Sequence, residues 1–299
     1  MHVFITGATG FVGTSVVQAL HKSGHTVLGL VRSPQSAQKL QATGAKALHG
    51  TLEDLEILQQ GAKECDGVIH LGFVHELMSS DFEKACAIDA TATETIGHAL
   101  EGTGKPFVYT SGLLGIRSDG VLATEGDERQ GGGAFHPRVK TESKVLGFAA
   151  KGVRAMVIRL PPSTHGEGDK GFVPMLTKVA QEKGVSGYIG GGTNAWPSCH
   201  RSDAAVLYKL ALEKGVAGGV HHAVHDQAVP TKDIAGVIGR KLGVPVVSIA
   251  QQEAAGHFGF MAWPLGMNAP TSGEKTQKEL GWLPVDSKLM EDLESGSYF

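Results

Sequence analysis

The fold of this 299-residue chain is decided by one stretch near its start, Val3-Phe-Ile-Thr-Gly-Ala-Thr-Gly-Phe-Val-Gly13. A short apolar strand runs into three glycines with the spacing Gly7-x-x-Gly10-x-x-Gly13, and a helical pattern follows as far as Gly24. Strand, glycine turn and helix together form the first half of a dinucleotide-binding βαβ unit. Gly7 permits the tight turn, Gly10 leaves space for a pyrophosphate, and Gly13 lets helix and strand pack closely.

The start of the predicted helix is suited to binding a diphosphate. Its first N–H groups have no acceptor within the helix, and the positive end of the helix dipole lies at the same place. We therefore expect the diphosphate of a dinucleotide to lie against the loop between strand and helix. The predicted contacts in this loop are Gly7, Thr9, Gly10, Phe11, Val12 and Gly13.

Strand and helix patterns alternate through the first half of the chain, which is typical of a parallel sheet with helices on both faces. The predicted fold class is therefore α/β, a Rossmann-type doubly wound parallel sheet with a small C-terminal substrate lobe. Further strands are predicted at 27–31, 45–48, 68–71, 107–110 and 155–160, and helices over about 52–63, 81–100 and 138–151.

The pattern changes after residue 160. A turn-rich loop occupies 161–171, and the apolar segment 257–267, interrupted by glycine and proline, is expected to be a covering loop or a short helix. No internal repeat is visible, and no linker is long enough to separate two independent domains. Residues 1–160 are predicted to form the NAD(P)-binding Rossmann core. Residues 161–299 are predicted to complete the sheet and to form the substrate lobe.

Composition limits the partners and the compartment. The net charge is −3 and there is no basic run, which argues against nucleic acid and anionic membranes as partners. No apolar stretch reaches the length of a membrane span, and a first strand that starts at His2 or Val3 leaves no room for a signal peptide. Cys65, Cys86 and Cys199 are odd in number and far apart, which favours a reducing compartment. We expect a cytoplasmic protein.

Five short motifs carry a resemblance to a known family. They are Thr6-Gly-Ala-Thr-Gly-Phe-Val-Gly13, Tyr109-Thr-Ser111, Val157-Ile-Arg-Leu-Pro161, His200-Arg-Ser-Asp-Ala204 and Leu280-Gly-Trp282. With these motifs the chain resembles the extended short-chain dehydrogenase/reductase superfamily, also called the NAD-dependent epimerase/dehydratase family, over essentially its whole length. More narrowly, it is similar to atypical branches in which the usual catalytic pair is degraded.

The resemblance implies a catalytic tyrosine that this chain lacks. Members of the family generally use a Tyr and, four residues later on the helix after the fifth strand, a Lys, because residues at this spacing share one helix face. The Lys holds the nicotinamide ribose and lowers the pKa of the Tyr, whose hydroxyl passes a proton to or from the substrate oxygen. Here no Tyr occurs between Tyr109 and Tyr188.

Two registers are open for the vacant positions. Alignment on the helix residue Glu142 puts Ala134 and Arg138 where Tyr and Lys would lie, and this register needs less adjustment of the distance to the next strand. Arg138 could then hold the ribose as a fixed cation, but Ala134 could do no acid–base chemistry. Alignment on residue type instead gives His136 as a proton donor and Lys140 as the ribose ligand. Both could equally be surface residues at the start of a helix.

Three further polar residues have both a functional and a structural interpretation. In the family resemblance Ser111, at the end of the fifth predicted strand, is the hydroxyl that orients the substrate, whereas a strand-end serine can also simply cap a turn. His165 and His200 are candidate replacements for the missing acid, but a lone histidine can also be a hydrogen-bonded structural residue.

The substrate is expected at the carboxyl edge of the sheet, where the loops after the fourth, fifth and sixth strands converge. The apolar side chains of the C-terminal part form either a lid over this edge or a small satellite core. The loop residues are Phe73, His75, Met78, Gly112, Leu113, Pro162, Ser163 and His165, and the apolar set is Phe258, Phe260, Met261, Trp263 and Met267.

The end of the second strand bears on the choice of cofactor. NAD-binding folds place an acid there for the adenosine ribose, whereas this chain has Arg32-Ser33. Arginine cannot accept the ribose hydroxyls but can pair with a 2′-phosphate, and Ser33 adds a donor, so NADP is favoured over NAD, against the alternative of a solvated arginine. Leu52 is expected near the adenine. The other expected cofactor contacts are Leu71, Gly72, Arg138 and Pro161.

These observations support one leading hypothesis and two alternatives. The first is an NADP-dependent oxidoreductase of the carbonyl reductase or alcohol dehydrogenase type that acts on a small, fairly apolar molecule, with Ser111 and either His136 with Lys140 or a histidine of the substrate loops at its centre. The second is an NADP(H)-binding regulator or sensor without turnover, and the third is an isomerase or lyase on the same fold. A small-molecule partner is expected, and the chain could be a monomer or a homodimer.

Overall fold

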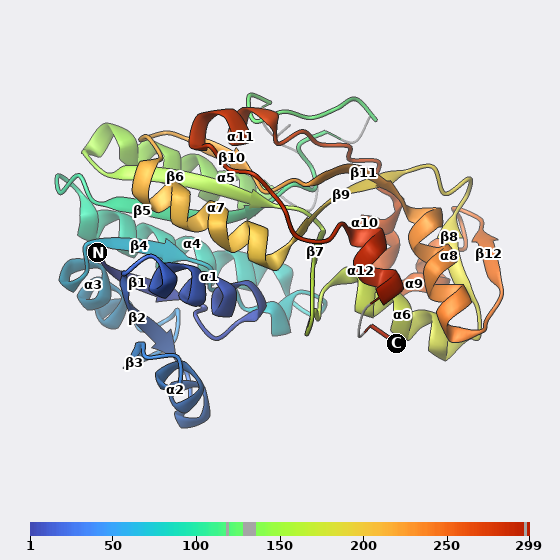
Figure 1. Ribbon diagram of the computed structural model, residues 1–299, viewed down its shortest axis with the longest axis horizontal. Helices are drawn as coiled ribbons and strands as arrows, with labels where there is room; N and C mark the ends of the chain where they lie inside the picture. The colour runs from blue at the N-terminus through green and yellow to red at the C-terminus, as the bar shows by residue number, and fades with distance from the viewer. Residues whose placement is uncertain (118–119, 128–135, 296–297) are drawn as a thin grey trace.

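Seven parallel strands form the central sheet of the computed structural model (Figure 1). The structure describes residues 1–117, 120–127, 136–295 and 298–299. The strand order is β10-β6-β5-β4-β1-β2-β3, and it reverses between β1 and β4. The predicted Rossmann-type parallel sheet is therefore confirmed. The strands are β1 (His2–Thr6), β2 (Thr26–Val31), β3 (Lys46–His49), β4 (Gly67–His70), β5 (Pro106–Gly112), β6 (Arg154–Leu160) and β10 (Val220–His222).

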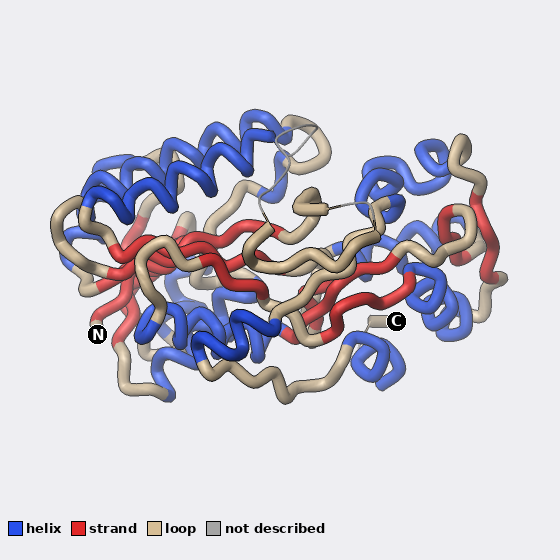
Figure 2. The backbone as a smooth tube through the Cα atoms, turned by 90° about the horizontal axis from the view of Figure 1, so that it is seen from above, coloured by secondary structure: helices blue, strands red, loops and turns tan. Residues whose placement is uncertain are grey.

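Helices cover both faces of this sheet (Figure 2). Each face has its own core of buried apolar side chains, because each helix turns its apolar side toward the strands. One face carries α1 (Phe11–Lys22), α2 (Pro34–Gln41) and α7 (Arg201–Lys214), and the other carries α3 (Leu55–Glu64), α4 (Phe82–Leu100), α5 (His136–Gly147) and η2 (Phe148–Lys151).

Residues after 160 contribute to the central sheet as well as to a separate lobe. β10 extends the sheet beside β6, and α7 packs against α1. The remaining residues form a C-terminal lobe with its own apolar core and two small sheets, of order β11-β9-β7 and β12-β8 (Figure 1). Its elements are β7 (Ser163–His165), α6 (Phe172–Lys183), β8 (Ser186–Ile189), β9 (Ala195–His200), β11 (Asp226–Pro230), α8 (Thr231–Leu242), β12 (Val246–Ile249), α9 (Ala254–Phe258), η3 (Gly259–Met261), α10 (Ala262–Gly266) and α12 (Leu289–Ser295). The helix α11 (Glu274–Leu280) instead packs against α7 and β10, at the central sheet.

The structure differs from the sequence prediction in the loop at 161–171. Ser163–His165 forms the strand β7, which pairs with β9 in parallel. A strand of three residues with two prolines before it has too few positions to show a period of two, so the sequence pattern could not reveal it.

The apolar segment 257–267 forms short helices and contributes to the core of the lobe. Phe258 and Met261 are buried there, and the ring N–H of Trp196 donates to the Pro264 carbonyl at 2.9 Å. Phe260 and Trp263, by contrast, are each 42% exposed. Phe258 and Met261 therefore belong to a small satellite core, as one of the two interpretations of this segment expected. No helix in the described part of the chain is both long and apolar enough to cross a bilayer.

A buried histidine on β10 predicts a loss of stability in acid. The His221 side chain is 1% exposed, and burial lowers its pKa to about 4, while Glu125 opposes this shift and Lys275 adds to it. An unfolded chain, with a histidine pKa near its usual ~6.5, binds the proton more readily, so His221 contributes stability above about pH 6.5 that is lost toward pH 4. At about pH 5 the loss should be roughly 2 kcal/mol.

Urea unfolding of the wild type and of His221→Leu at neutral pH and at about pH 5 tests this expectation. The variant should lose roughly 2 kcal/mol less between the two conditions. His49→Gln, which changes an exposed histidine on β3, should show the wild-type pH dependence. An equal loss in His221→Leu and the wild type would contradict the assignment.

Candidate cofactor and active site

The glycine loop between β1 and α1 has the geometry that a diphosphate requires. Gly7 has a φ of +71°, and a Cβ on it would lie 2.9 Å from the Gly72 nitrogen, so the loop can pass the end of β4 only as glycine. A Cβ on Gly13 would lie 2.0 Å from the Gly7 carbonyl oxygen. Gly10 is exposed at the N-cap of α1, and no described side chain caps this helix end. The first N–H groups of α1 therefore have no capping side chain among the described residues, which fits a diphosphate.

The adenosine end of the predicted site lies after β2. The Arg32 side chain is 65% exposed, and its Nη2 donates to Glu76 Oε1 at 2.9 Å. Ser33 caps α2, because its Oγ accepts from the Ser36 N–H at 3.2 Å. Leu52 lies at the same edge, since a Cβ on Gly72 would be 3.0 Å from Leu52 Cδ2.

Two basic residues beside the glycine loop, Lys39 and Arg201, were not among the predicted cofactor contacts. Lys39, on α2, donates from Nζ to the Thr9 carbonyl at 3.3 Å. The Arg201 guanidinium lies 5.1 Å from the centre of the Phe11 ring, so the two cations flank the glycine loop. The signal that could have found Lys39 is its place on the helix that begins directly after Arg32-Ser33. Both cations line a cavity of about 290 Å³ together with Ala8, Thr9, Thr14, Val17, Gln18, Leu40 and Thr43.

Arg138 is the residue of α5 that lies at the carboxyl end of β5. Its Nη2 donates to the Thr110 carbonyl at 2.8 Å, and its guanidinium lies 4.5 Å from the centre of the Phe73 ring. The side chain is 14% exposed, whereas Lys140, two residues further and hence on the other side of the helix, is exposed. Arg138 therefore faces the end of β5, and the choice of register stays a prediction.

The other members of the two registers are less fully described. His136 is the first residue of α5, and Ala134 lies outside the described residues. Ser111 is buried near the end of β5, opposite Arg159 of β6 in the strand register. The predicted catalytic roles of Ser111, His136 and Lys140 stay predictions.

A buried carboxylate, which the sequence prediction missed, anchors Arg138. Asp89, on α4, accepts from the Tyr109 hydroxyl at 2.6 Å and lies 3.3 Å from His70 Nε2 and 3.4 Å from Arg138 Nη1. Burial alone would raise the pKa of Asp89, but the Arg138 charge and the hydrogen bonds from His70 and Tyr109 hold this pKa below its usual value. The available signal was that Asp89 is the one acid at the spacing of the buried face of α4, whose other members are small or apolar residues.

The same network continues to the glycine strand. His70 Nδ1 lies 2.7 Å from the Thr6 hydroxyl, and this hydroxyl oxygen also accepts from the Gly72 N–H at 3.0 Å. One chain of hydrogen bonds therefore joins the last residue of β1, the end of β4 and the start of α5. It fixes the glycine loop and Arg138 relative to each other.

A second buried ion pair fixes the rest of α5. Arg159 Nη2 donates to Glu142 Oε1 at 2.6 Å, and Arg159 Nη1 lies 3.1 Å from His222 Nε2. Glu142 is four residues after Arg138 and so shares its helix face. Glu142, the residue on which one of the two sequence registers was aligned, is therefore a buried residue with a fixed partner.

The two histidines of the C-terminal half have structural partners. His165 is fully buried, with Nδ1 2.9 Å from Asp292 Oδ2, and burial lowers its pKa although Asp292 opposes this shift. His200 caps α7 by accepting from the Ser202 N–H at 3.3 Å. These contacts support the structural interpretation of both residues.

The remaining predicted substrate residues divide by exposure. Leu113 and Ser163 are buried, and Met78 and Pro162 are half-buried. Pro161, which was predicted as a cofactor contact, is buried. His75 is exposed, with its ring 5.3 Å from the Phe73 ring in an edge-on arrangement. Of this set, Phe73 and His75 are thus the side chains that the structure brings beside Arg138.

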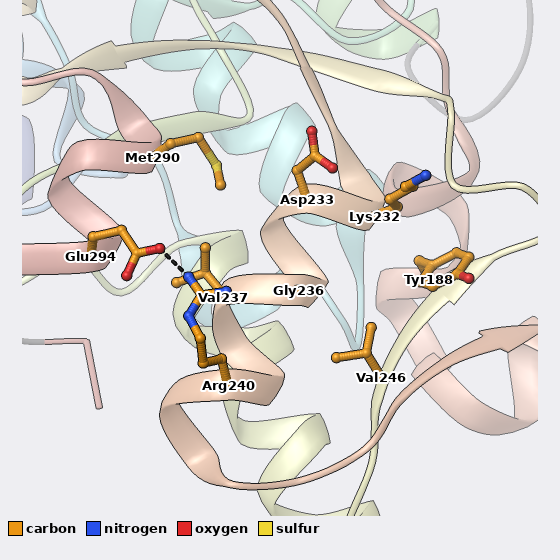
Figure 3. A pocket seen from close by; sticks show the side chains of 9 residues that line it. All are labelled: Tyr188, Lys232, Asp233, Gly236, Val237, Arg240, Val246, Met290 and Glu294. Atoms are coloured by element: carbon orange, nitrogen blue, oxygen red, sulfur yellow. Dashed lines mark hydrogen bonds and ion pairs between the residues drawn. The ribbon is translucent and has the colours of Figure 1, made fainter.

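A larger cavity lies away from this edge. It has a volume of about 450 Å³ and is in the C-terminal lobe, where Figure 3 shows it along α8, with an ion pair between Arg240 and Glu294. None of its lining residues belongs to the predicted site. They are Tyr188, Lys232, Asp233, Gly236, Val237, Arg240, Val246, Met290 and Glu294.

Comparison with known proteins agrees with this architecture. A model of the NmrA-like family matches residues 1–91. An uncharacterized protein of Schizosaccharomyces pombe is 49% identical over 299 residues, 100% of both chains. The 4-hydroxy-2-methyl-3-oxo-4-farnesyl-3,4-dihydroquinoline-1-oxide ketoreductase of Stigmatella aurantiaca is 27% identical over 94% of this chain and 92% of its own. The solved structure of MoeE5 in complex with UDP-glucose and NAD has a TM-score of 0.78 at 20% identity, covering 99% of this chain and 97% of that one.

The parallel sheet and its glycine turn define a Rossmann-type α/β protein. More specifically, the chain belongs to the extended short-chain dehydrogenase/reductase superfamily, as its sequence motifs predicted. Named relatives include a 2-alkyl-3-oxoalkanoate reductase, a sterol-4-alpha-carboxylate 3-dehydrogenase and an epimerase family protein.

Proposed function

We propose that this protein is an NADP-dependent oxidoreductase that reduces a carbonyl group of a small, fairly apolar molecule. The observation that carries the proposal is the position of Arg138, which is anchored at the end of β5. In the proposal Arg138 replaces the ribose-holding lysine of the family. The relative from Stigmatella aurantiaca, which is named as a ketoreductase of a farnesylated compound, supports a carbonyl substrate of this kind.

The residues at the sheet edge fit the proposed cofactor. The free N–H groups at the start of α1 would hold the diphosphate, and Arg32 would pair with the 2′-phosphate. Lys39, beside the glycine loop, adds positive charge at the same end. When bound, NADPH supplies the hydride for the reduction of the carbonyl carbon.

The protein's own residues would position the substrate and deliver the proton. Arg138 holds the nicotinamide ribose as a fixed cation, and Ser111 orients the substrate oxygen. A histidine then gives the proton, and His136 and His75 are the two candidates because both belong to segments next to Arg138 in the fold. Orientation and exclusion of water can preserve much of the acceleration when one proton donor replaces another.

A second candidate function is an NADP(H)-binding regulator without turnover. One observation favours it: the chain has no Tyr between Tyr109 and Tyr188, so the family's usual proton donor is missing. Both functions predict that the protein binds NADP(H), but only the oxidoreductase would consume it.

We also propose a cytoplasmic location. Cys65, Cys86 and Cys199 are all buried as free thiols, which is the state expected in a reducing compartment.

A turnover assay tests the proposed reaction. The protein should consume NADPH, followed by its absorbance, with members of a panel of apolar ketones and aldehydes, and faster than it consumes NADH. Ser111→Ala should lower kcat/KM by about tenfold or more, since a hydroxyl that binds the developing oxyanion is lost. Ser143→Ala, which removes an exposed hydroxyl on α5, is the matched control and should be unchanged. NADPH binding without consumption for any carbonyl would favour the regulator instead.

A further inference from the structure

An ion pair spans the adenosine end of the site. Arg32 follows β2, and Glu76 lies in η1 (His75–Leu77), the short helix after β4, so the two residues are far apart in the sequence. Their side chains meet at 2.9 Å and are 65% and 61% exposed. The carboxylate of Glu76 therefore accepts a hydrogen bond from one N–H group of the Arg32 guanidinium. The same guanidinium is the group that is predicted to bind the 2′-phosphate.

A 2′-phosphate and this carboxylate make opposing demands on Arg32. A guanidinium binds a carboxylate and a phosphate through the same N–H groups, so full pairing with the phosphate removes donors from Glu76. If Glu76 stays in place, two anions share one cation and repel each other. NAD(H) has no 2′-phosphate and leaves the Arg32–Glu76 pair intact.

We propose that Glu76 competes with the 2′-phosphate of NADP(H) for Arg32 and is therefore a specificity-determining residue that limits the preference for NADP(H) over NAD(H). This inference rests on the proposed cofactor. Glu76 works through Arg32 rather than by touching the reacting atoms.

The variant Glu76→Gln tests the competition, because it removes the charge and keeps the shape. We expect its Kd for NADPH to fall by about three- to tenfold, the range of a released surface ion pair plus relieved repulsion. Its Kd for NADH should stay within about twofold of the wild type, since NADH does not need Arg32. Titration of the full chain with each cofactor at one fixed ionic strength measures both constants. Glu83→Gln, a neighbouring exposed acid on α4, controls for the general effect of lost negative charge.

The variant Arg32→Ala separates the two levels of the proposal. It should weaken NADPH by about tenfold or more relative to NADH, and in its background Glu76→Gln should have less than about a twofold effect on NADPH. If Arg32→Ala does not weaken NADPH relative to NADH, the proposed cofactor preference fails. If Arg32→Ala behaves as expected but Glu76→Gln leaves NADPH binding unchanged or weakens it, only the competition fails, and Glu76 then holds Arg32 in position.

Discussion

Asp89→Ala is expected to destabilise the protein by about 3–5 kcal/mol, the cost of removing one partner from a buried charged network. The substitution leaves Arg138 without its carboxylate and deprives His70 and the Tyr109 hydroxyl of their shared acceptor. Urea unfolding followed by circular dichroism measures the change. The stabilising contribution of Asp89 should be present above the usual carboxyl pKa and be lost in acid, because the pKa of Asp89 is lowered in the folded protein.

Two further variants make this prediction specific. Glu94→Ala removes another acid of α4, whose ion pair with Lys144 is exposed, and should cost at most about 0.5 kcal/mol. The double variant Asp89→Ala/Arg138→Met removes the stranded cation and should be more stable than Asp89→Ala by about 1–3 kcal/mol. Equal costs for Asp89→Ala and Glu94→Ala would show that the buried network contributes little.

Gly13→Val should reduce binding of both NADPH and NADH by about 100-fold or more, corresponding to about 3 kcal/mol. The Cβ would lie 2.0 Å from the Gly7 carbonyl oxygen, a backbone atom that cannot turn aside as a side chain would. The loop must therefore shift away from the start of α1, and the N–H groups that face the diphosphate would move with it. Fluorescence titration with each reduced cofactor measures the loss.

Gly236→Val is the matched control for this substitution. Gly236 also lies inside a helix, but a Cβ there meets no atom within 4 Å. This variant should bind both cofactors like the wild type and change the stability by about 0.5 kcal/mol or less. Undiminished binding by Gly13→Val would show that the glycine loop does not form the diphosphate site.

The sequence was sufficient to predict six of the seven strands of the central sheet, because most of them are apolar runs separated by helical patterns; β10, with three residues, was not predicted. β1 and β2, for example, are buried over nearly their whole length. The short strands of the lobe could not be predicted in this way. β9 contains Pro197 and ends in polar residues, and its place is set by pairing with β7 and β11, which are distant in the sequence.

The parts of the candidate site that depend on backbone geometry could be predicted from the sequence. The direction in which a side chain of α5 points could not. The glycine spacing identified the loop at 7–13, because only glycine fits the close approach of Gly7 to β4. The sequence could not show which of Arg138 and Lys140 faces the end of β5, since both are basic residues on one helix and they point in different directions. The role of Asp89 was missed because its partners come from two strands and another helix.

The segment from Phe73 to Glu76 reaches both ends of the proposed site within four residues. Phe73 lies against Arg138, and Glu76 pairs with Arg32. In the proposed site, one short piece of chain therefore carries both the residue that would influence the choice of cofactor and a residue on the substrate side. An insertion or deletion in this segment would displace both contacts at once. One of the two contacts can therefore be changed independently only by a substitution that keeps the length of the segment.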